Sequence, residues 1–401
     1  MPSSPSETGP QFKEETALLH AGRFAGDLPA TVNPPIQRGS TVLLDSAAAL
    51  HDASRVTYGR EGLATHAALR SALAALEHGD EAFLYPSGLA AIAAAMLAFL
   101  ETGDEVLMVD SVYAPTRRFA VEALARFGIT ARFFDPAMEV KRLATLISPA
   151  TRLIVLESPG SQTFDVVDVP AIARIARSLG ILTMMDNTWS AGLLFKPLDH
   201  GVDVSIQAVT KYIGGHSDLM MGAAIARGAA AARLKRSYCE TGWTVSPDDA
   251  YQALRGLRTL PTRLARHGEN ALAVARWLES RPEVAEVLCP ALPGARGHAL
   301  WKRDFTGISG LFAAVLNPVP EAAVAEMVSS LKLFGLGFSW GGYESLIIPG
   351  DGELTTRRFK PRYAGPLIRL HVGLEDPADL IADLAAGLSR LAVPAREVAA
   401  E

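Results

Sequence analysis

Short apolar runs alternate with helical segments through the middle of the chain. Runs typical of buried strands occupy residues 106–109, 153–157, 181–185, 204–206 and 223–226. Residues 117–127 and 170–178, which lie between such runs, read as helical segments. This alternation predicts an α/β fold with a largely parallel sheet covered on both faces. Ligands of such sheets bind at the carboxyl ends of the strands, so the residues that follow the strands are the candidates for chemistry.

The two ends of the chain have other patterns. Residues 1–62 are rich in Pro, Gly, Ser and Thr and have little periodicity, which predicts an extended arm that begins with a disordered tail and lies on a partner subunit. A helix is expected from Ala64 to His78. A helical region with a break at Pro261 marks the domain change, so residues 63–257 are expected to form a large domain and residues 258–401 a smaller α+β domain.

Composition and charge narrow the class of protein. The 401 residues are 49% hydrophobic and 20% charged with a formal net charge of −5, which favours a globular enzyme and gives no basic footprint for nucleic acid or an anionic membrane. The two cysteines, Cys239 and Cys289, lack metal-site spacing and fit a reducing compartment. The longest apolar run, residues 88–100, is too short to span a membrane and predicts a buried helix. We therefore expect a cytoplasmic enzyme for a small molecule, with no metal.

Lys211 lies between a short apolar run and a pair of glycines, in the segment 207–218. A lysine in apolar surroundings has a lowered pKa, and its neutral amine can form a Schiff base with a carbonyl cofactor such as pyridoxal phosphate. A lysine whose amine simply reaches solvent would fit the same position. The residue alone leaves both interpretations open.

The start of the apolar helix is a candidate phosphate site. Ser87 precedes this helix, so the amides of Gly88 and Leu89 would be free at a helix N-terminus, where a phosphate binds well. Thr210, beside the lysine, could add a hydroxyl to the same phosphate. The alternative is that Ser87 is an ordinary helix cap.

Asp186 follows the predicted strand at 181–185. A carboxylate there is costly unless it has a cationic partner, and a protonated pyridine nitrogen would be such a partner. The alternative is a carboxylate that caps the turn at residues 187–189.

Tyr113 and Arg369 are further candidates. Tyr113 follows the strand at 106–109, where its ring could stack on a flat cofactor and its phenol could act as acid or base; otherwise it is a half-buried loop tyrosine. Arg369 shares one face of a predicted strand with His371 and suits bidentate binding of a substrate carboxylate. A salt bridge within the smaller domain is the alternative for Arg369.

Ordered blocks along the chain carry a family resemblance. They are residues 58–60 (Tyr-Gly-Arg), 63–66 (Leu-Ala-Thr-His), 86–90 (Pro-Ser-Gly-Leu-Ala), 157–161 (Glu-Ser-Pro-Gly-Ser), 186–189 (Asp-Asn-Thr-Trp), 210–212 (Thr-Lys-Tyr), 215–218 (Gly-His-Ser-Asp) and 339–345 (Ser-Trp-Gly-Gly-Tyr-Glu-Ser). Together they closely resemble the Cys/Met-metabolism family of pyridoxal phosphate (PLP) enzymes, from about residue 15 to 395. The resemblance implies an aspartate-aminotransferase-like (fold type I) architecture, usually assembled as a homotetramer of catalytic dimers.

The resemblance also implies roles for individual residues. Lys211 resembles the Schiff-base lysine, Asp186 the partner of the pyridine nitrogen and Tyr113 the stacking ring, with Gly88, Leu89 and Thr210 as phosphate contacts. Tyr58 and Arg60 resemble a pair that enters a neighbouring subunit's site. Ser339 and Arg369 match the positions that bind the α-carboxylate of the substrate, and Trp340 and Tyr58 also fall in the implied substrate site.

Within the family, the blocks are most similar to the bacterial cystathionine β-lyases. The implied reaction is β-elimination of L-cystathionine to homocysteine, pyruvate and ammonia, with Lys211 as general base and Lys211 or Tyr113 as proton donor. Pro115 stands where methionine γ-lyases carry a cysteine. Two departures affect the comparison: Phe338 replaces a tyrosine frequent in β-lyases, and Ala208 replaces a phosphate-binding serine of several relatives.

Other reactions remain open at this point. They include the γ-lyase, γ-synthase, cysteine desulfhydrase and methionine γ-lyase reactions of the same family. A serine hydrolase is a remote alternative, because residues 337–341 match a nucleophile elbow around Ser339 and are followed by Asp351 and His371. The predicted turn and short strand after Ser339 argue against it, because the elbow requires a helix there.

Overall fold

A seven-stranded sheet forms the centre of the first part of the chain. A computed structural model describes residues 12–23, 31–52 and 54–391, and the predicted disordered tail lies outside them. The strands are β1 (Glu81–Tyr85), β2 (Glu105–Val109), β3 (Thr130–Phe134), β4 (Thr151–Glu157), β5 (Leu182–Asp186), β6 (Val204–Gln207) and β7 (Gly222–Ala226). Their order is β1-β7-β6-β5-β4-β2-β3, and only β7 runs antiparallel to its neighbours. The predicted, mostly parallel sheet is confirmed.

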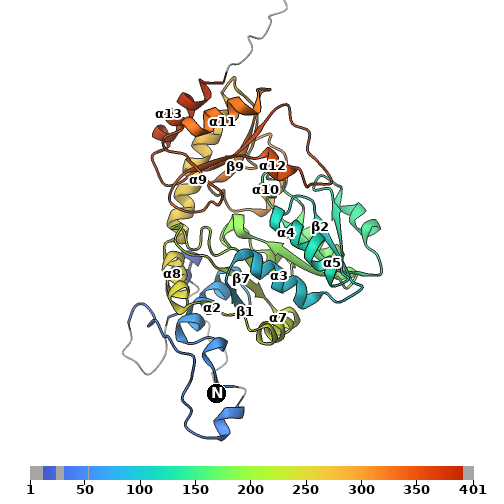
Figure 1. Cartoon of the computed structure of the whole chain (residues 1–401), viewed down its shortest axis with the longest axis vertical. Coiled ribbons are helices and arrows are strands. Elements are labelled where there is room, and N and C mark those ends of the chain that lie inside the picture. The colour runs from blue at the N-terminus through green and yellow to red at the C-terminus, as the bar shows by residue number, and fades with distance from the viewer. Residues whose placement is uncertain (1–11, 24–30, 53, 392–401) are drawn as a thin grey trace, which may run out of the picture.

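A five-stranded sheet forms the second part, with the order β10-β11-β12-β9-β8. Its strands are β8 (Val284–Leu288), β9 (Leu311–Leu316), β10 (Gly335–Leu336), β11 (Leu346–Pro349) and β12 (Leu367–His371). In Figure 1 it lies with α9, α11 and α13 at the orange and red end of the molecule, above the larger sheet. The domain division near residue 258 remains our proposal and would fall between helices α8 and α9.

The helices cover both faces of the larger sheet. The helices of the first part are α1 (Glu14–His20), α2 (Ala64–Glu77), α3 (Gly88–Phe99), α4 (Ala114–Arg118), α5 (Leu124–Arg126), α6 (Val169–Ser178), α7 (Gly228–Thr241) and α8 (Pro247–Arg258). Those of the second part are α9 (Leu260–Glu279), α10 (His298–Asp304), α11 (Glu321–Ser330), α12 (Asp351–Leu354) and α13 (Pro377–Leu388). Successive residues of β7 show the two faces: Ala223 and Ile225 pack in a core with α2 and α8, whereas Ala224 and Ala226 pack in the core that contains α3. Among the described residues, no helix has both the length and the apolar character needed to cross a bilayer.

Three details differ from the expectations. The break between α8 and α9 falls at Thr259 rather than at Pro261, because proline is tolerated in the first turn of a helix, where Pro261 lies. The helix expected at 117–127 begins at Ala114 and contains a π-helical turn, Phe119–Ala123. Strands β1, β3, β8 and β10 were not predicted.

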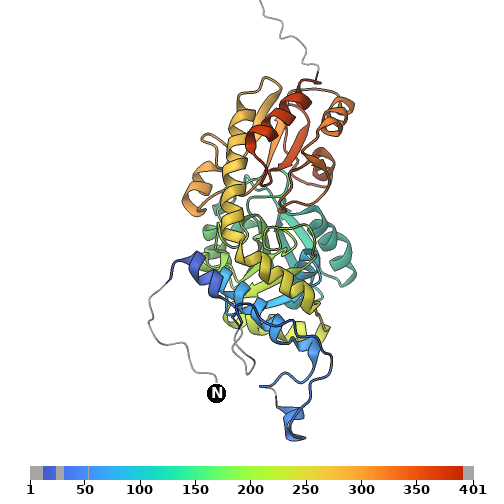
Figure 2. The ribbon, with the colours of Figure 1, turned by 90° about the vertical axis from the view of Figure 1, so that its left-hand side faces the viewer.

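The N-terminal arm is less extended than expected. It contains α1, whose Leu18 is buried and whose backbone carbonyl accepts a hydrogen bond from Arg258 Nη1 at 2.7 Å. In its described residues 31–52 and 54–62 the arm carries only two short 3₁₀ turns, and in Figures 1 and 2 it extends below the body of the molecule.

Candidate active site

Lys211 lies in the loop that follows β6, at the carboxyl edge of the larger sheet. Its Nζ donates a hydrogen bond to Ser339 Oγ at 2.6 Å and lies 5.1 Å from the centre of the Trp340 ring. The pKa of Lys211 is lowered to about 8, mainly by burial and also by the charge of Arg369, whereas the charge of Asp186 opposes both effects. The amine therefore does not simply reach solvent, and a large fraction of it is neutral near pH 8.

Asp186 ends β5, and Glu157 ends the neighbouring strand β4 directly opposite it. Burial raises the pKa of both carboxyls, and the charge of Asp186 raises that of Glu157 further. Glu157 Oε2 accepts a hydrogen bond from the backbone N–H of Tyr113 at 2.6 Å. The two adjacent carboxyls therefore lie in a place where a cation would be stabilised.

Thr188 holds Asp186 in position. Asp186 Oδ1 accepts hydrogen bonds from the Thr188 backbone N–H at 3.0 Å and from its hydroxyl at 2.5 Å, and the Thr188 hydroxyl accepts one from the Ala208 N–H at 2.9 Å. Oδ1 of Asp186 therefore caps the turn at residues 187–189, as the alternative interpretation predicted. No hydrogen-bond partner of Asp186 Oδ2 is found among the described residues, so this oxygen fits the predicted contact with a protonated pyridine nitrogen.

The start of α3 fits a phosphate. Ser87 caps the helix by accepting a hydrogen bond from Ala90 N at 3.1 Å, and no described residue accepts one from the amides of Gly88 or Leu89. A Cβ at position 88 would lie 2.7 Å from the Cβ of Ala208, so only glycine allows this close approach. The helix start and the lysine loop therefore lie side by side, as the prediction of a shared phosphate site requires.

Thr210 is oriented differently from the expectation. Its hydroxyl donates to the Met221 carbonyl at 3.1 Å and accepts from the Met221 N–H at 2.9 Å. Its only proton is therefore used within the protein. A phosphate contact from Thr210 remains a prediction and would require this proton to change partner.

The turn at residues 339–342 brings the smaller sheet to Lys211. Ser339 has φ +89°, a conformation rare for residues other than glycine, and Gly341 has φ +91°. A Cβ at Gly341 would lie 2.7 Å from the backbone nitrogen of Tyr212. The backbone of this turn therefore packs directly against the backbone of the lysine loop.

Arg369, in β12, lies behind the same turn. Its Nη2 donates to the Ser339 carbonyl at 3.0 Å, and its Nε is buried without a hydrogen-bond partner among the described residues. Burial lowers its pKa to about 10. No acidic side chain of the described residues pairs with it within 4.0 Å, so the predicted alternative of a salt bridge is wrong. An unpaired guanidinium N–H beside the lysine is suited to a carboxylate.

Among the described residues, no hydrogen bond joins the side chains of Tyr113, Tyr58 or Arg60 to the Lys211 amine. Tyr113 precedes α4 and is 43% exposed, and burial, followed by the charges of Asp186 and Glu157, raises its pKa. Tyr58 and Arg60 lie in the arm, with the guanidinium carbon of Arg60 5.7 Å from the centre of the Tyr58 ring. Their entrance into a second subunit's site remains a prediction.

The residues of a serine hydrolase are present but do not form a triad. Ser339 Oγ faces Lys211, whereas His371 Nε2 contacts Gly341 N at 3.1 Å and Gly342 O at 3.0 Å. Asp351 accepts a hydrogen bond from the backbone of Leu367. The next element after Ser339 is strand β11 rather than a helix, as predicted. The nucleophile-elbow interpretation is therefore rejected.

These contacts define a class of protein. A lysine that is partly neutral near pH 8, close to a buried carboxylate with a free oxygen, fits a PLP-dependent enzyme, in which the lysine holds the aldehyde and the carboxylate pairs with the ring nitrogen.

Comparisons with known proteins also indicate a PLP-dependent enzyme. The family model described as Cys/Met metabolism PLP-dependent enzyme matches residues 15–389. The chain is 45% identical to the cystathionine β-lyase MetC of Escherichia coli (strain K12), over 94% of this chain and 99% of that protein. It is 42% identical to an L-alanine/L-glutamate racemase of Wolbachia pipientis wMel, over 95% of this chain and 98% of that protein. The crystal structure of metB from Corynebacterium glutamicum superposes with a TM-score of 0.88 at 29% identity, covering 94% of this chain and 98% of that one.

The chain belongs to the Cys/Met metabolism family of PLP-dependent enzymes. The fold type I architecture expected from the resemblance is confirmed by the structural match. The cofactor is pyridoxal 5′-phosphate, as predicted.

Sequence reasoning missed three contributions to the site. Thr188 and Glu157 lie in blocks that carried the resemblance, but only the structure shows that they bond Asp186 and Tyr113. His371 was considered only as a member of a triad, although it contacts the Gly341–Gly342 backbone. The position of Thr188 two residues after a buried aspartate was the available signal for a side-chain cap.

Proposed function

We propose that this enzyme is a cystathionine β-lyase that splits L-cystathionine into homocysteine, pyruvate and ammonia. The observation that carries the proposal is the contact between Lys211 Nζ and the Ser339 turn, whose carbonyl is bound by Arg369. It puts a base next to a carboxylate-binding arginine, as elimination from an α-amino acid requires. The similarity to MetC of Escherichia coli supports cystathionine as the substrate.

In this reaction, different residues of the chain would bind the substrate and transfer protons. Bound PLP supplies an electron-withdrawing ring that stabilises negative charge at the substrate Cα. Arg369 and Ser339 bind the α-carboxylate and orient the Cα–H bond, and Trp340 and Tyr58 contribute to the substrate site. Lys211 removes the Cα proton as general base, because its lowered pKa keeps part of the amine neutral. Lys211 or Tyr113 returns a proton to the departing thiolate.

A second candidate is amino-acid racemisation, favoured by the 42% identity to the Wolbachia racemase. Racemisation also begins with removal of the Cα proton but returns it to the same carbon, so it needs no leaving group. Phe338, which precedes Ser339 in the chain, is 75% exposed. The two candidates therefore differ in the step after proton removal: a β-lyase releases a thiolate, whereas a racemase returns the proton to Cα.

Product analysis tests the proposed reaction. Purified enzyme incubated with L-cystathionine should form pyruvate and homocysteine in equal amounts. Formation of 2-oxobutyrate would instead indicate γ-elimination, and formation of D-alanine from L-alanine without pyruvate from cystathionine would indicate a racemase. Parallel assays with cystine, cysteine and methionine, scored by the oxo acid produced, define the substrate range.

We further propose a cytoplasmic homotetramer built from catalytic dimers. The arm exposes large apolar side chains, with Val32 79% and Leu43 93% exposed, and such a surface favours coverage by a second copy of the chain. In each dimer, Tyr58 and Arg60 of one subunit would reach the phosphate site of the other. The absence of a basic surface charge excess agrees with a small-molecule enzyme without nucleic-acid or membrane partners.

Mixing two inactive variants tests the shared site. Co-expression of Arg60→Ala and Lys211→Ala should restore about a quarter of wild-type activity, because half of randomly formed dimers are hybrids and each hybrid has one native site of two. The matched control is co-expression of Asp186→Asn and Lys211→Ala. Both residues belong to one subunit's site, so no hybrid gains a native site and activity should stay low. Equal activities of the two mixtures would contradict the proposed arm exchange.

A further inference from the structure

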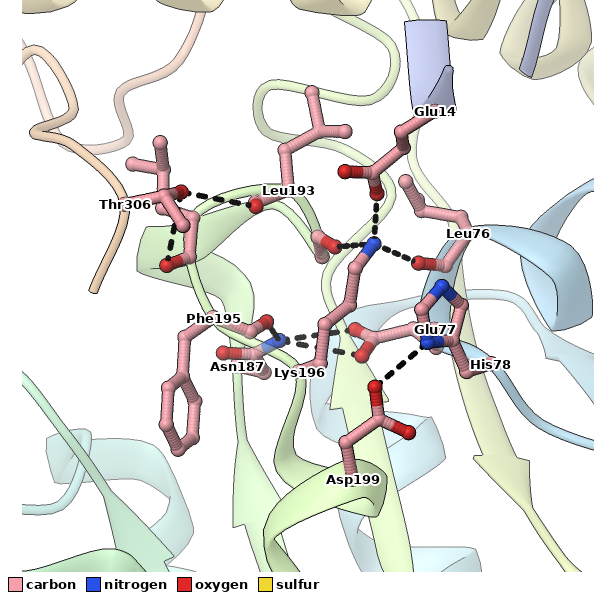
Figure 3. A network of polar contacts seen from close by, with 12 residues as sticks. Glu14, Leu76, Glu77, His78, Asn187, Leu193, Phe195, Lys196, Asp199 and Thr306 are labelled. Carbon is pink, nitrogen blue, oxygen red and sulfur yellow. Dashed lines mark hydrogen bonds and ion pairs between the residues drawn. The ribbon is translucent and has the colours of Figure 1, made fainter. Parts of the chain in front are cut away.

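Glu77 is a fully buried carboxylate at the end of α2, behind the active site. Its Oε1 accepts hydrogen bonds from Asn187 Nδ2 at 3.1 Å and from Gln207 Nε2 at 2.5 Å, and its Oε2 lies 3.3 Å from Asn187 Nδ2. Figure 3 shows Glu77 and Asn187 directed toward each other. Burial raises the pKa of Glu77, whereas these hydrogen bonds and the charge of Lys196 oppose the shift. The carboxylate is therefore held mainly by two neutral amides.

The two amides have only one workable orientation. Asn187 Nδ2 also donates to the Phe195 carbonyl at 3.0 Å, and Gln207 Nε2 also donates to the Asn187 carbonyl at 3.0 Å. Every partner of the two NH₂ groups is thus an acceptor. If either amide were flipped, its oxygen would face a carboxylate and a carbonyl. The carboxylate of Glu77 therefore fixes both side chains.

Asn187 and Gln207 flank the residues of the cofactor site. Asn187 follows Asp186, and Gln207 ends β6, four residues before Lys211. The loops after β5 and β6 are joined by the Gln207–Asn187 hydrogen bond and by two further links. Glu77 bonds both amides, and the Thr188 hydroxyl bonds both Asp186 and the Ala208 N–H. A shift at Glu77 would therefore be transmitted to Asp186 and to the Lys211 loop.

Lys196 connects the same region to the arm. Its Nζ donates to Glu14 of α1, to the Leu76 carbonyl and, at 2.5 Å, to the Gly192 carbonyl (Figure 3). Leu76 precedes Glu77 in α2. The end of α2 is therefore fixed from two sides, by the strand-end amides and by Lys196.

We propose that Glu77 is a positioning residue for the PLP site: its carboxylate, by binding Asn187 and Gln207, sets the relative position of Asp186 and the Lys211 loop. The proposal rests on the proposed cofactor-binding roles of Asp186 and Lys211 but is independent of which amino acid the enzyme cleaves. It assigns a role to a residue that does not contact the cofactor or the substrate.

The experiment compares Glu77→Gln with wild type by PLP binding rather than by turnover alone. PLP is removed from the purified enzyme and titrated back while the visible absorbance of the lysine-linked cofactor is followed. Loss of a buried charged hydrogen-bond acceptor should raise the dissociation constant for PLP about tenfold or more. The increase in unfolding temperature caused by saturating PLP should shrink in the same variant, because ligand stabilisation depends on affinity.

Glu105→Gln is the matched control. Glu105 is also buried and accepts hydrogen bonds from Thr151 Oγ1 at 2.6 Å, Ser148 Oγ at 3.1 Å and Arg132 Nη1 at 3.2 Å. It is the first residue of β2, so it lies at the amino end of a strand, whereas the site lies at the carboxyl ends. The Glu105→Gln variant should have a less stable apoprotein than wild type, but its PLP dissociation constant should stay within about twofold of the wild-type value. Equal losses of PLP affinity in the two variants would overturn the proposal, because they would reflect general destabilisation.

A second variant covers the case in which Glu77→Gln does not fold. Gln207→Met removes one of the two amides and keeps the carboxylate, so a smaller loss of PLP affinity is expected. Unchanged PLP affinity in Glu77→Gln or Gln207→Met would overturn the positioning role. A wild type that binds no PLP would instead contradict the cofactor site itself, so the two failures are distinguishable.

Discussion

Lys211→Ala should lower turnover of L-cystathionine at least about a thousandfold and remove the yellow colour of the purified enzyme. General base catalysis contributes about 10²- to 10⁴-fold, and in the proposed role the same amine would also hold the cofactor covalently, so both contributions would be lost together. The lowered pKa of about 8 is the physical basis, because an ordinary lysine would be almost entirely protonated at this pH. Turnover is measured by pyruvate formation, and the colour by the visible spectrum.

The Lys211→Arg variant tests whether the positive charge at position 211 is sufficient or whether the covalent link to the cofactor is required. Arginine keeps a positive charge beside Ser339 and Trp340 but does not form the covalent link. We expect it to be as inactive and colourless as the alanine variant. Lys235→Ala, which alters an exposed lysine paired with Glu81, should remain yellow and active. A yellow, fully active Lys211→Ala enzyme would refute the assignment of the lysine.

Asp186→Asn should lower kcat/KM for L-cystathionine about a hundredfold or more. The substitution keeps the size of the side chain and can keep the hydrogen bonds from Thr188 to one oxygen. It removes the negative charge that would hold the pyridine nitrogen protonated, so the ring would withdraw electrons less effectively. Preorganised charges of this kind contribute about 3–4 kcal/mol in enzyme sites, which corresponds to this range of rates. Steady-state kinetics on PLP-saturated enzyme measure the effect.

Glu157→Gln is the informative comparison, because Glu157 lies opposite Asp186 on the neighbouring strand. Its carboxylate accepts a hydrogen bond from the Tyr113 N–H, and a glutamine oxygen can accept the same bond. A clearly smaller loss of kcat/KM is therefore expected. Equal losses in the two variants would mean that the site requires only negative charge in this region, and that the specific pairing of Asp186 with the ring is wrong.

The interior strands could be predicted from the sequence, and the edge strands could not. Strands β2, β4, β5, β6 and β7 are interior strands that read as apolar runs. The missed strands β1 and β3 are the two edges of the larger sheet, and the missed strands β8 and β10 are the two edges of the smaller one. β3 places Arg132 at a half-exposed position, where it pairs with Glu105 at 3.2 Å. Such strands lack a continuous apolar run and form because a neighbouring strand supplies hydrogen-bond partners.

The sequence by itself determined the PLP class, and it predicted the lysine and the strand ends that would carry the chemistry. These signals are local: a strand followed by a polar residue, or a helix start after a serine, is visible within a few neighbouring residues. The order of the blocks then identified the family.

Only the tertiary structure decided which residues meet. Ser339 accepts a hydrogen bond from Lys211, 128 positions away, and Gln207 reaches Glu77 across 130 positions. The structure also turned the Thr210 hydroxyl toward Met221 rather than outward. The physical reason is that such contacts depend on how the two sheets and α2 pack around shared cores, and packing joins residues without regard to their separation in sequence.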